Sequence, residues 1–213
     1  MLKINDYSLY LVISEEYGLS RSAVEIASLA ISGGVDIIQM REKNKDRDEL
    51  VKLACELSSL CQKKRVIFIV NDDPLIARES NASGVHLGQE DMLKYSLTET
   101  RNIIGNGKII GVSTHSLAEL EKVNECDVDY IAYGPIFPTE TKKYFLGAKD
   151  IKEALKIAKK PVVFIGGINL SNLGEILKQG AKNIAVIRGI IQAEDIIGRA
   201  RNFKDRLIKE KEK

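Results

Sequence analysis

The sequence has little of what marks several classes of protein. Its 213 residues include three cysteines, Cys55, Cys61 and Cys126, whose spacing fits neither a metal site nor a disulfide framework. No stretch approaches the roughly 20 consecutive apolar residues of a membrane span, and the N-terminal residues lack the apolar core of a secretory signal. We therefore expect a cytoplasmic protein with no membrane partner.

The sequence also has no marked excess of basic over acidic residues. The 32 basic and 30 acidic residues give a formal net charge of +2, so the composition predicts no strong field for nucleic acid. No linker rich in proline, glycine or serine divides the chain, and 44% of the residues are hydrophobic, enough for a full core. We expect one domain over residues 1–213, and the composition leaves a homo-oligomer open.

Short β-branched runs alternate with longer segments of helical apolar spacing along the whole chain. The predicted strands are Leu9–Ile13, Val35–Met40, Val66–Val70, Gly84–Leu87, Lys108–Val112, Tyr130–Tyr133, Val162–Ile165 and Ile184–Ile187. Eight such units predict the α/β class and a (β/α)8 TIM barrel, with an open doubly wound sheet as the alternative. In a barrel the active site lies in the loops at the C-terminal ends of the strands.

The second predicted strand runs into a cationic segment. If Ile37 points into the barrel, the period of two places Gln39, Arg41 and Lys43 on the inner wall as well. An arginine fork and a lysine at a strand mouth are typical of a phosphate site. A solvated strand end is the alternative interpretation.

Two aspartates end the neighbouring third and fourth strands. Asp72 and Asp91 could share one ion, and two carboxylates with substrate phosphate oxygens and water are typical ligands of Mg²⁺. The alternative is that each is a helix N-cap, because Asp72-Asp73-Pro74 places a proline at a plausible first helical position.

A second anion site is predicted at the other side of the mouth. Gly166-Gly167 and Arg188-Gly189 end the seventh and eighth strands, where barrels frequently bind phosphate through backbone N–H groups. The loop Thr139-Glu-Thr-Lys142 could reach either phosphate, or be an ordinary surface loop. His86 fits a hydrogen-bonded core residue, while His115 precedes a capping box and could lie at the pocket mouth. Two anion sites in one pocket suggest a reaction that joins two phosphorylated molecules.

Six runs, in order from the second strand to the eighth, closely resemble the thiamin phosphate synthase family. They are Gln39-Met-Arg-Glu-Lys43, Asn71-Asp72, Gly84-Val-His-Leu-Gly-Gln-Glu-Asp91, Gly111-Val-Ser-Thr-His115, Gly134-Pro-Ile-Phe-Pro-Thr-Glu-Thr-Lys142 and Ile165-Gly-Gly-Ile168. Arg188 departs from the family, in which many members have serine at this position.

The resemblance implies a transferase that couples 4-amino-5-hydroxymethyl-2-methylpyrimidine diphosphate to 4-methyl-5-(2-hydroxyethyl)thiazole phosphate. The products would be thiamin phosphate and diphosphate. The family mechanism is dissociative: diphosphate leaves first, and the thiazole nitrogen then attacks a pyrimidine methylene cation.

The resemblance also implies roles for individual residues. The pyrimidine diphosphate would be bound by Gln39, Met40, Arg41, Glu42, Lys43, Asn71, Ser113 and Lys142, of which Lys142, Ser113 and Arg41 are expected to be catalytic. The thiazole phosphate would be bound by Thr139, Glu140, Thr141, Gly167, Ile187 and Arg188. Mg²⁺ would be bound by Asp72 and Asp91.

Two other functions remain open at this point. A thiazole tautomerase of the same family resembles this sequence at His115, but isomerisation releases no diphosphate and needs no metal carboxylates. A non-catalytic barrel that senses a phosphorylated metabolite is the other alternative. Asp72, Asp91 and the Thr139–Lys142 loop favour the synthase over both.

Overall fold

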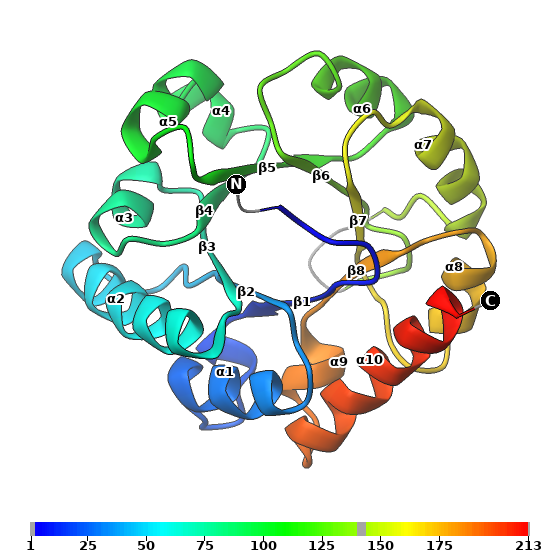
Figure 1. Ribbon diagram of the computed structural model, residues 1–213, viewed down its shortest axis with the longest axis horizontal. Helices are drawn as coiled ribbons and strands as arrows, with labels where there is room; N and C mark the ends of the chain where they lie inside the picture. The colour runs from blue at the N-terminus through cyan, green and yellow to red at the C-terminus, as the bar shows by residue number, and fades with distance from the viewer. Residues whose placement is uncertain (1–2, 140–143, 213) are drawn as a thin grey trace.

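The computed structural model describes residues 3–139 and 144–212, and its strands form a closed parallel barrel in the order β1 to β8 (Figure 1). The strands are β1 (Leu9–Ile13), β2 (Ile37–Met40), β3 (Ile67–Asn71), β4 (Gly84–Leu87), β5 (Ile109–Thr114), β6 (Tyr130–Tyr133), β7 (Val162–Ile165) and β8 (Asn183–Val186). The barrel closes where β8 pairs with β1, with Leu9 opposite Ile184. The predicted TIM barrel is confirmed, and the open sheet is excluded.

Helices surround the barrel on its outside (Figure 1). They are α1 (Ala23–Ser32), α2 (Arg47–Lys64), α3 (Pro74–Glu79), α4 (Asp91–Lys94), α5 (Leu97–Ile104), α6 (Leu117–Val123), α7 (Ile151–Ile157), α8 (Leu173–Lys178), α9 (Arg188–Ile191) and α10 (Ile196–Lys211), with 3-10 turns at Glu15–Tyr17 and Ala148–Asp150. None of the helices within the described ranges combines the length and apolarity that crossing a bilayer requires.

Local sequence explains where the longest helix begins and ends. Asp46 and Glu49 form a capping box at the start of α2, each side chain accepting a hydrogen bond from the other's backbone N–H. At the other end, Arg65 adopts a left-handed conformation with φ 58° and stops the helix. The chain then enters β3 directly.

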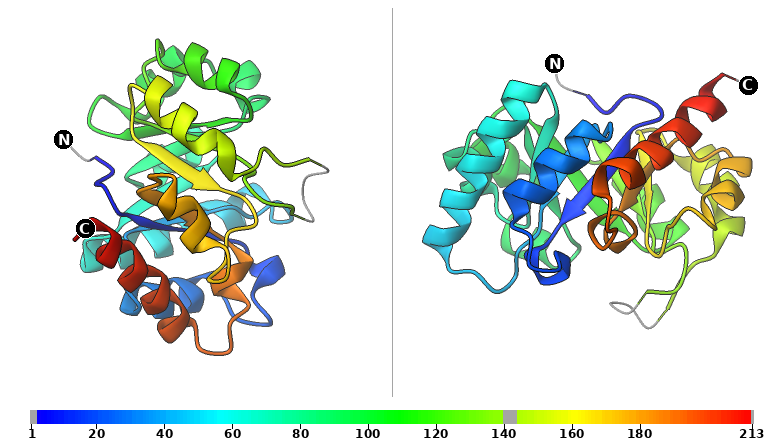
Figure 2. Two further views of the ribbon diagram at one scale, coloured as in Figure 1. Left: turned by 90° about the vertical axis from the view of Figure 1, so that its right-hand side faces the viewer. Right: turned by 90° about the horizontal axis from the view of Figure 1, so that it is seen from below.

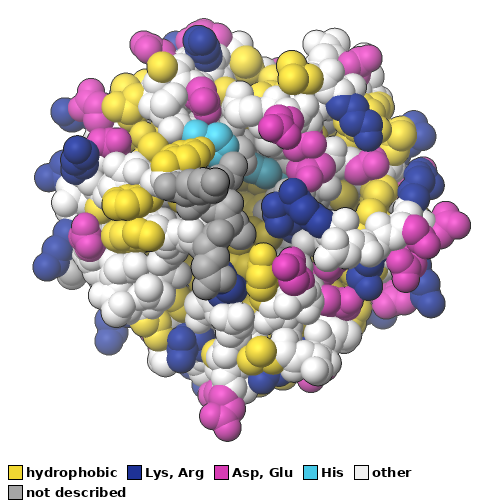
Figure 3. All heavy atoms as spheres, turned by 180° about the vertical axis from the view of Figure 1, so that it is seen from behind, with side chains coloured by type: hydrophobic (Ala, Val, Ile, Leu, Met, Phe, Trp, Pro, Cys, Tyr) yellow, Lys and Arg dark blue, Asp and Glu magenta, His cyan; other side chains and the backbone are white. Residues whose placement is uncertain are grey.

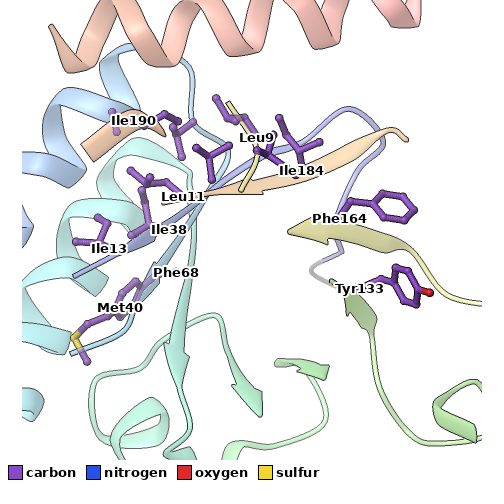
Figure 4. Close-up of a cluster of buried hydrophobic side chains, with 14 of the residues drawn as sticks. Leu9, Leu11, Ile13, Ile38, Met40, Phe68, Tyr133, Phe164, Ile184 and Ile190 are labelled. Carbon is purple, nitrogen blue, oxygen red and sulfur yellow. The ribbon is translucent and has the colours of Figure 1, made fainter. Parts of the chain in front are cut away.

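The period of two along the strands divides the core into two layers. Outward-facing residues such as Leu9, Leu11, Ile38 and Phe68 pack between the strands and the helices (Figure 4). Inward-facing residues fill the barrel itself: Ile4, Tyr10, Val12, Ile37, Ile69, Ile109, Tyr130, Ala132, Val163 and Ala185. Ile37 belongs to the inner layer, so the predicted parity is confirmed within the strand, which ends at Met40 and includes Gln39 but not Arg41 and Lys43.

Two strands, β3 and β5, extend further than predicted, because polar residues at their ends still pair with the neighbouring strand. Asn71 lies opposite His86, and Ser113 lies opposite Ala132, so β3 and β5 continue past the apolar runs that identified them. Because these residues belong to strands rather than loops, their side chains keep the inward orientation of the residues two positions earlier. Strand pairing, rather than loop conformation, therefore orients two of the predicted site residues.

The two ends of the barrel have different structures. The N-terminal segment and the end of α10 lie at one end, and the strand arrowheads point to the opposite end (Figure 2). The first end is closed by Ile4, which packs into the inner layer and is only 7% exposed. The open mouth is therefore the end reached by the C-termini of the strands.

Candidate active site

Polar side chains gather at the mouth formed by the C-terminal ends of the strands, where histidine, basic and acidic side chains lie around the barrel axis (Figure 3). On the β2–β3 side, the Gln39 amide donates a hydrogen bond of 2.9 Å to Oδ1 of Asn71. Gln39 is buried and Asn71 half-buried, so this pair forms a fixed polar floor. The structure thus brings together two of the residues predicted to bind the pyrimidine diphosphate.

Arg41 and Lys43 follow β2 and lie beside the carboxylate of Asp72. Their positive charges lower the pKa of Asp72, although burial and Asp91 act more strongly in the opposite direction. The backbone N–H of Arg41 bonds the carbonyl of Ile13 at 2.9 Å, which extends the β1–β2 pairing and anchors the base of the arginine. Two cations beside a carboxylate are the arrangement expected for an anion held together with a metal.

Asp72 and Asp91 face one another across the ends of β3 and β4. Burial first, and then a hydrogen bond and charge repulsion from Asp91, raise the pKa of Asp72 to about 7. Asp91 in turn accepts a 2.9 Å hydrogen bond from the N–H of Gly88. Two carboxylates this close repel one another unless a proton or a cation lies between them.

The helix-cap alternative for Asp72 is excluded. The N-cap of α3 is Asp73, whose Oδ1 accepts from the backbone N–H groups of Leu75 and Ile76 at 2.8 and 3.1 Å. Asp72 instead adopts φ 68°, a conformation that few residues other than glycine, asparagine and aspartate take, and its side chain is left for the pocket. Asp91 is the first residue of α4, and its side chain bonds backwards to Gly88 instead of capping that helix.

The donor chemistry of this pair fits Mg²⁺. A hollow of about 160 Å³ is lined by Asn71, Asp72, Asp91 and Lys94 among other residues. Within residues 3–139 and 144–212 there is no group of three or more His, Cys, Asp or Glu side chains able to hold a metal, so a protein-only cage is not formed. One or two carboxylates completed by phosphate oxygens and water are how Mg²⁺ is usually bound.

Met40 and Glu42, which were also predicted to bind the pyrimidine diphosphate, lie at the edge of the same hollow. The Met40 side chain packs in the outer core layer, and a carboxylate oxygen of Glu42 accepts a 2.7 Å hydrogen bond from the N–H of Glu15. Both residues line the hollow. Met40 is on the opposite strand face from Gln39, so its contact with a diphosphate at the mouth would come from its backbone, and the Glu42 carboxylate is engaged by Glu15.

Ser113 lies at the end of β5 and is bonded to His86 of β4. The distance from Nε2 of His86 to Oγ of Ser113 is 2.8 Å, and Nδ1 of His86 lies 2.8 Å from the hydroxyl of Tyr130. Burial lowers the pKa of His86 to about 4, so the ring is neutral at physiological pH. His86 is therefore the hydrogen-bonded interior residue that its position in a strand predicts.

His115 occupies the rim of the mouth. Its Nδ1 lies 2.7 Å from the carbonyl oxygen of Gly134, and the centroids of its ring and the Tyr144 ring are 6.3 Å apart, with the ring planes nearly perpendicular. The predicted capping box at α6 forms in part: Ser116 accepts from the N–H of Glu119, but the Glu119 side chain bonds the N–H of His115 instead of that of Ser116.

Only part of the second predicted phosphate site lies within the residues that the structure describes. Gly167, Ile187 and Arg188 follow β7 and β8, and the Arg188 guanidinium lies over the ring of Tyr17 at 5.4 Å. Thr139 is at the edge of the described chain. Glu140, Thr141 and Lys142 lie outside the described residues.

The two glycines after β7 have a packing reason that the sequence does not reveal. A Cβ on Gly166 would lie 2.4 Å from Cα of Pro135, and one on Gly167 would lie 2.6 Å from the carbonyl oxygen of Pro138. Both have left-handed backbones, with φ 102° and 65°. They allow the loop after β6 to pack against β7, whatever else they do for a phosphate.

Replacing Gly166 by alanine is expected to lower the free energy of unfolding by about 1–3 kcal/mol, because the backbone is strained for any side chain and the Cβ meets Pro135. Gly107→Ala is the matched control, since nothing lies within 4 Å of its Cβ position. Urea unfolding of both variants measures the difference. Equal midpoints for the two would contradict this account of the glycine pair.

Some interior residues of the site were not predicted. Tyr10 and Tyr130 extend the His86–Ser113 pair into the barrel, with 2.9 Å between their hydroxyls. Tyr130 shares the inward parity of Ala132, which was available from the sequence, but its partner lies 120 residues away. Only the closed barrel brings these side chains together.

Comparisons with known proteins agree with this architecture. A family model described as thiamine monophosphate synthase matches residues 9–190. The chain belongs to the thiamine monophosphate synthase family. The resemblance and the transferase function expected from the sequence are thereby confirmed.

Individual relatives cover nearly the whole length of this family member. It is 40% identical over 193 residues to the thiamine-phosphate synthase of Persephonella marina, covering 90% of this chain and 91% of the relative. It is 42% identical over 204 residues to that of Methanocella arvoryzae, covering 93% of both. A solved structure titled thiamine phosphate pyrophosphorylase from Pyrococcus furiosus matches with a TM-score of 0.87 at 31% identity, covering 96% of each chain.

Proposed function

We propose that this chain joins 4-amino-5-hydroxymethyl-2-methylpyrimidine diphosphate to 4-methyl-5-(2-hydroxyethyl)thiazole phosphate, giving thiamin phosphate and diphosphate. One observation carries the proposal: two facing carboxylates lie beside two cations at the open end of the barrel. Relatives at 40% and 42% identity that are named thiamine-phosphate synthase support the same reaction.

The residues around Asp72 suit the departure of diphosphate. Arg41 and Lys43 provide a planar fork and a point charge, and Gln39 and Asn71 provide fixed amide groups at the floor. Negative charge grows on the bridging oxygen as the carbon–oxygen bond breaks, and pre-positioned cations stabilise that charge best. Asp72 and Asp91 would hold Mg²⁺, which when bound supplies further charge neutralisation of the diphosphate.

The remaining roles follow the family resemblance. Ser113 would contact the pyrimidine and Lys142 the leaving diphosphate, while Thr139, Glu140, Thr141, Gly167, Ile187 and Arg188 would hold the thiazole phosphate. Among these, the geometry supports Ser113 most directly, because its hydroxyl is at the mouth and is fixed from below by His86. In a dissociative substitution the thiazole nitrogen then attacks the pyrimidine methylene cation that remains after the diphosphate has left.

The tautomerase alternative fits less well. An isomerisation within one thiazole releases no diphosphate, so it gives no role to a carboxylate pair beside two cations. The same set argues against a sensor, since binding alone needs no stabilisation of a leaving group. A cytoplasmic location and the lack of nucleic-acid and membrane partners remain predictions, and the sequence leaves a homo-oligomer open.

The test of the function is to mix the protein with both substrates and Mg²⁺ and to follow diphosphate and thiamin phosphate together. We expect both products in equal amounts and their loss on adding EDTA. Isomerisation of the thiazole without diphosphate release would replace the proposal by the tautomerase, and binding without turnover would replace it by the sensor.

Binding of Mg²⁺ is expected to weaken about tenfold when the pH falls from 8 to 6. The sign follows from the pKa of Asp72, raised to about 7 by burial and by Asp91: below that pH a proton must leave before the ion can bind. Calorimetric titration of Mg²⁺ at pH 6, 7 and 8 measures the effect. A dissociation constant that stays level across this range would contradict it.

A further inference from the structure

A line of four hydrogen-bonded side chains runs up the inside of the barrel to the mouth. Tyr10 of β1 lies 2.9 Å from Tyr130 of β6, which lies 2.8 Å from Nδ1 of His86, whose Nε2 lies 2.8 Å from Ser113. Tyr10 is 2% exposed and Tyr130 is fully buried, so their hydroxyls have no access to bulk water. The proposed function uses only the last of the four, Ser113.

The barrel makes room for this line at a glycine. A Cβ on Gly111 of β5 would lie 2.0 Å from Cζ of Tyr130 and 2.4 Å from its hydroxyl oxygen. The Tyr130 ring therefore occupies the space that a side chain at position 111 would fill, and it stacks on the His86 ring with the centroids 5.5 Å apart. This packing fixes where the Tyr130 hydroxyl points.

The buried end of the line sets the direction of its hydrogen bonds. Among the residues that the structure describes, Tyr130 is the one hydrogen-bond partner of the Tyr10 hydroxyl. If Tyr130 donated to Tyr10, the Tyr10 proton would be buried without an acceptor, which is unfavourable. Tyr10 therefore donates to Tyr130.

The direction then passes along the line to the mouth. Tyr130 has a single proton, which it donates to Nδ1 of His86, so Nδ1 is the acceptor nitrogen of the neutral ring. The proton of His86 is consequently on Nε2 and is donated to Oγ of Ser113. The proton of Ser113 remains available for a group in the pocket.

We propose that Tyr130, oriented by Tyr10, is a positioning residue that holds His86 in its Nε2–H tautomer, so that Ser113 meets the substrate as a hydrogen-bond donor. The chemical class it selects is a ring with an acceptor nitrogen facing β5, which a neutral pyrimidine offers. This assignment rests on the proposed function for the identity of the substrate. The tautomer itself does not depend on that function.

The test reads the tautomer by long-range ¹H–¹⁵N correlation spectra of ¹⁵N-histidine-labelled protein without substrate. In the wild type we expect protonated Nε2 and unprotonated Nδ1 for His86. The second histidine, His115, serves as an internal reference with the opposite tautomer, since its Nδ1 faces the Gly134 carbonyl and must donate. Protonated Nδ1 at His86 would overturn the proposal.

Two variants that each remove one hydroxyl separate positioning from packing. Tyr130→Phe removes the donor to Nδ1, and we expect mixed tautomers at His86 and kcat/KM for the pyrimidine diphosphate lower by about tenfold. Tyr133→Phe, the matched control, removes a buried hydroxyl of the same strand that has no hydrogen-bond partner among the described residues, and should keep both the tautomer and kcat/KM within about twofold. An unchanged tautomer and unchanged kcat/KM in Tyr130→Phe would overturn the proposal.

Two substitutions at His86 test whether another hydrogen-bond donor at this position preserves activity. Glutamine carries an amide N–H that can donate to Ser113, whereas leucine cannot, so His86→Gln is expected to keep more activity than His86→Leu. Equal loss in both would contradict the donor role. If the wild type makes no thiamin phosphate, the proposed function fails, while the spectra of the free protein still accept or reject the tautomer.

Discussion

Replacing Asp72 by asparagine is expected to lower Mg²⁺-dependent formation of thiamin phosphate by at least about 100-fold without unfolding the protein. Asparagine is the suitable substitution because, like aspartate, it tolerates the backbone at φ 68°. It also removes a carboxylate whose pKa is raised by burial and by Asp91, so the metal-free fold should be as stable as the wild type or more so. Steady-state assays and thermal unfolding measure the two effects.

The next residue along the chain provides a control with the opposite outcome. Asp73 caps α3 through hydrogen bonds of 2.8 and 3.1 Å, so Asp73→Ala should cost about 1 kcal/mol of stability. Asp73 borders the hollow, but its carboxylate is held by the N–H groups of the helix, so the activity of folded protein should be kept. Full Mg²⁺-dependent activity in Asp72→Asn, or its loss in folded Asp73→Ala, would reject the assigned metal site.

Replacing Arg41 by methionine is expected to have the second large effect on catalysis. We expect kcat/KM for the pyrimidine diphosphate to fall by about 10²–10³, because a fixed cation beside the leaving group is lost. The Arg41 charge lowers the pKa of Asp72, so the variant should also need a higher pH to bind Mg²⁺. Measuring kcat/KM and the pH dependence of Mg²⁺ binding on one variant tests both expectations.

Arg47→Met is the matched control for this substitution. Arg47 begins α2 and forms an exposed ion pair of 2.6 Å with Glu79, a kind of pair that contributes little to stability. We expect nearly wild-type kinetics and unfolding from it. If Arg41→Met behaved like Arg47→Met, the cationic end of β2 would be a solvated strand end, as the alternative interpretation holds.

Much of the site was accessible from the sequence because strand side chains alternate. The inward position of Ile37 also places Gln39 on the inner wall, and the same rule applies to Asn71 and Ser113 once their strands are known to continue through them. Where strands end was less accessible, since pairing with a neighbouring strand, and not apolarity, extended β3 and β5. A pattern along one segment cannot report on a partner elsewhere in the chain.

The adjacent residues Asp72 and Asp73 show the same limit of prediction from sequence. From the sequence, Asp72 was a candidate cap for α3 because of the proline at position 74, and Asp73 was not considered. The choice was made by tertiary contacts: the N–H of Asp72 bonds the carbonyl of His86 at 2.8 Å, which turns its side chain toward Asp91. Asp73 is then left to accept from the helix.

The sequence by itself determined the number of strand–helix units, the faces of the strands and the end of the barrel where polar residues gather, because these depend on local periodicity. Only the tertiary structure decided which side chains meet across the barrel, such as Tyr10, Tyr130, His86 and Ser113 from four different strands. Their distances depend on the register of every strand pair and on the closure of β8 onto β1, which no local pattern contains.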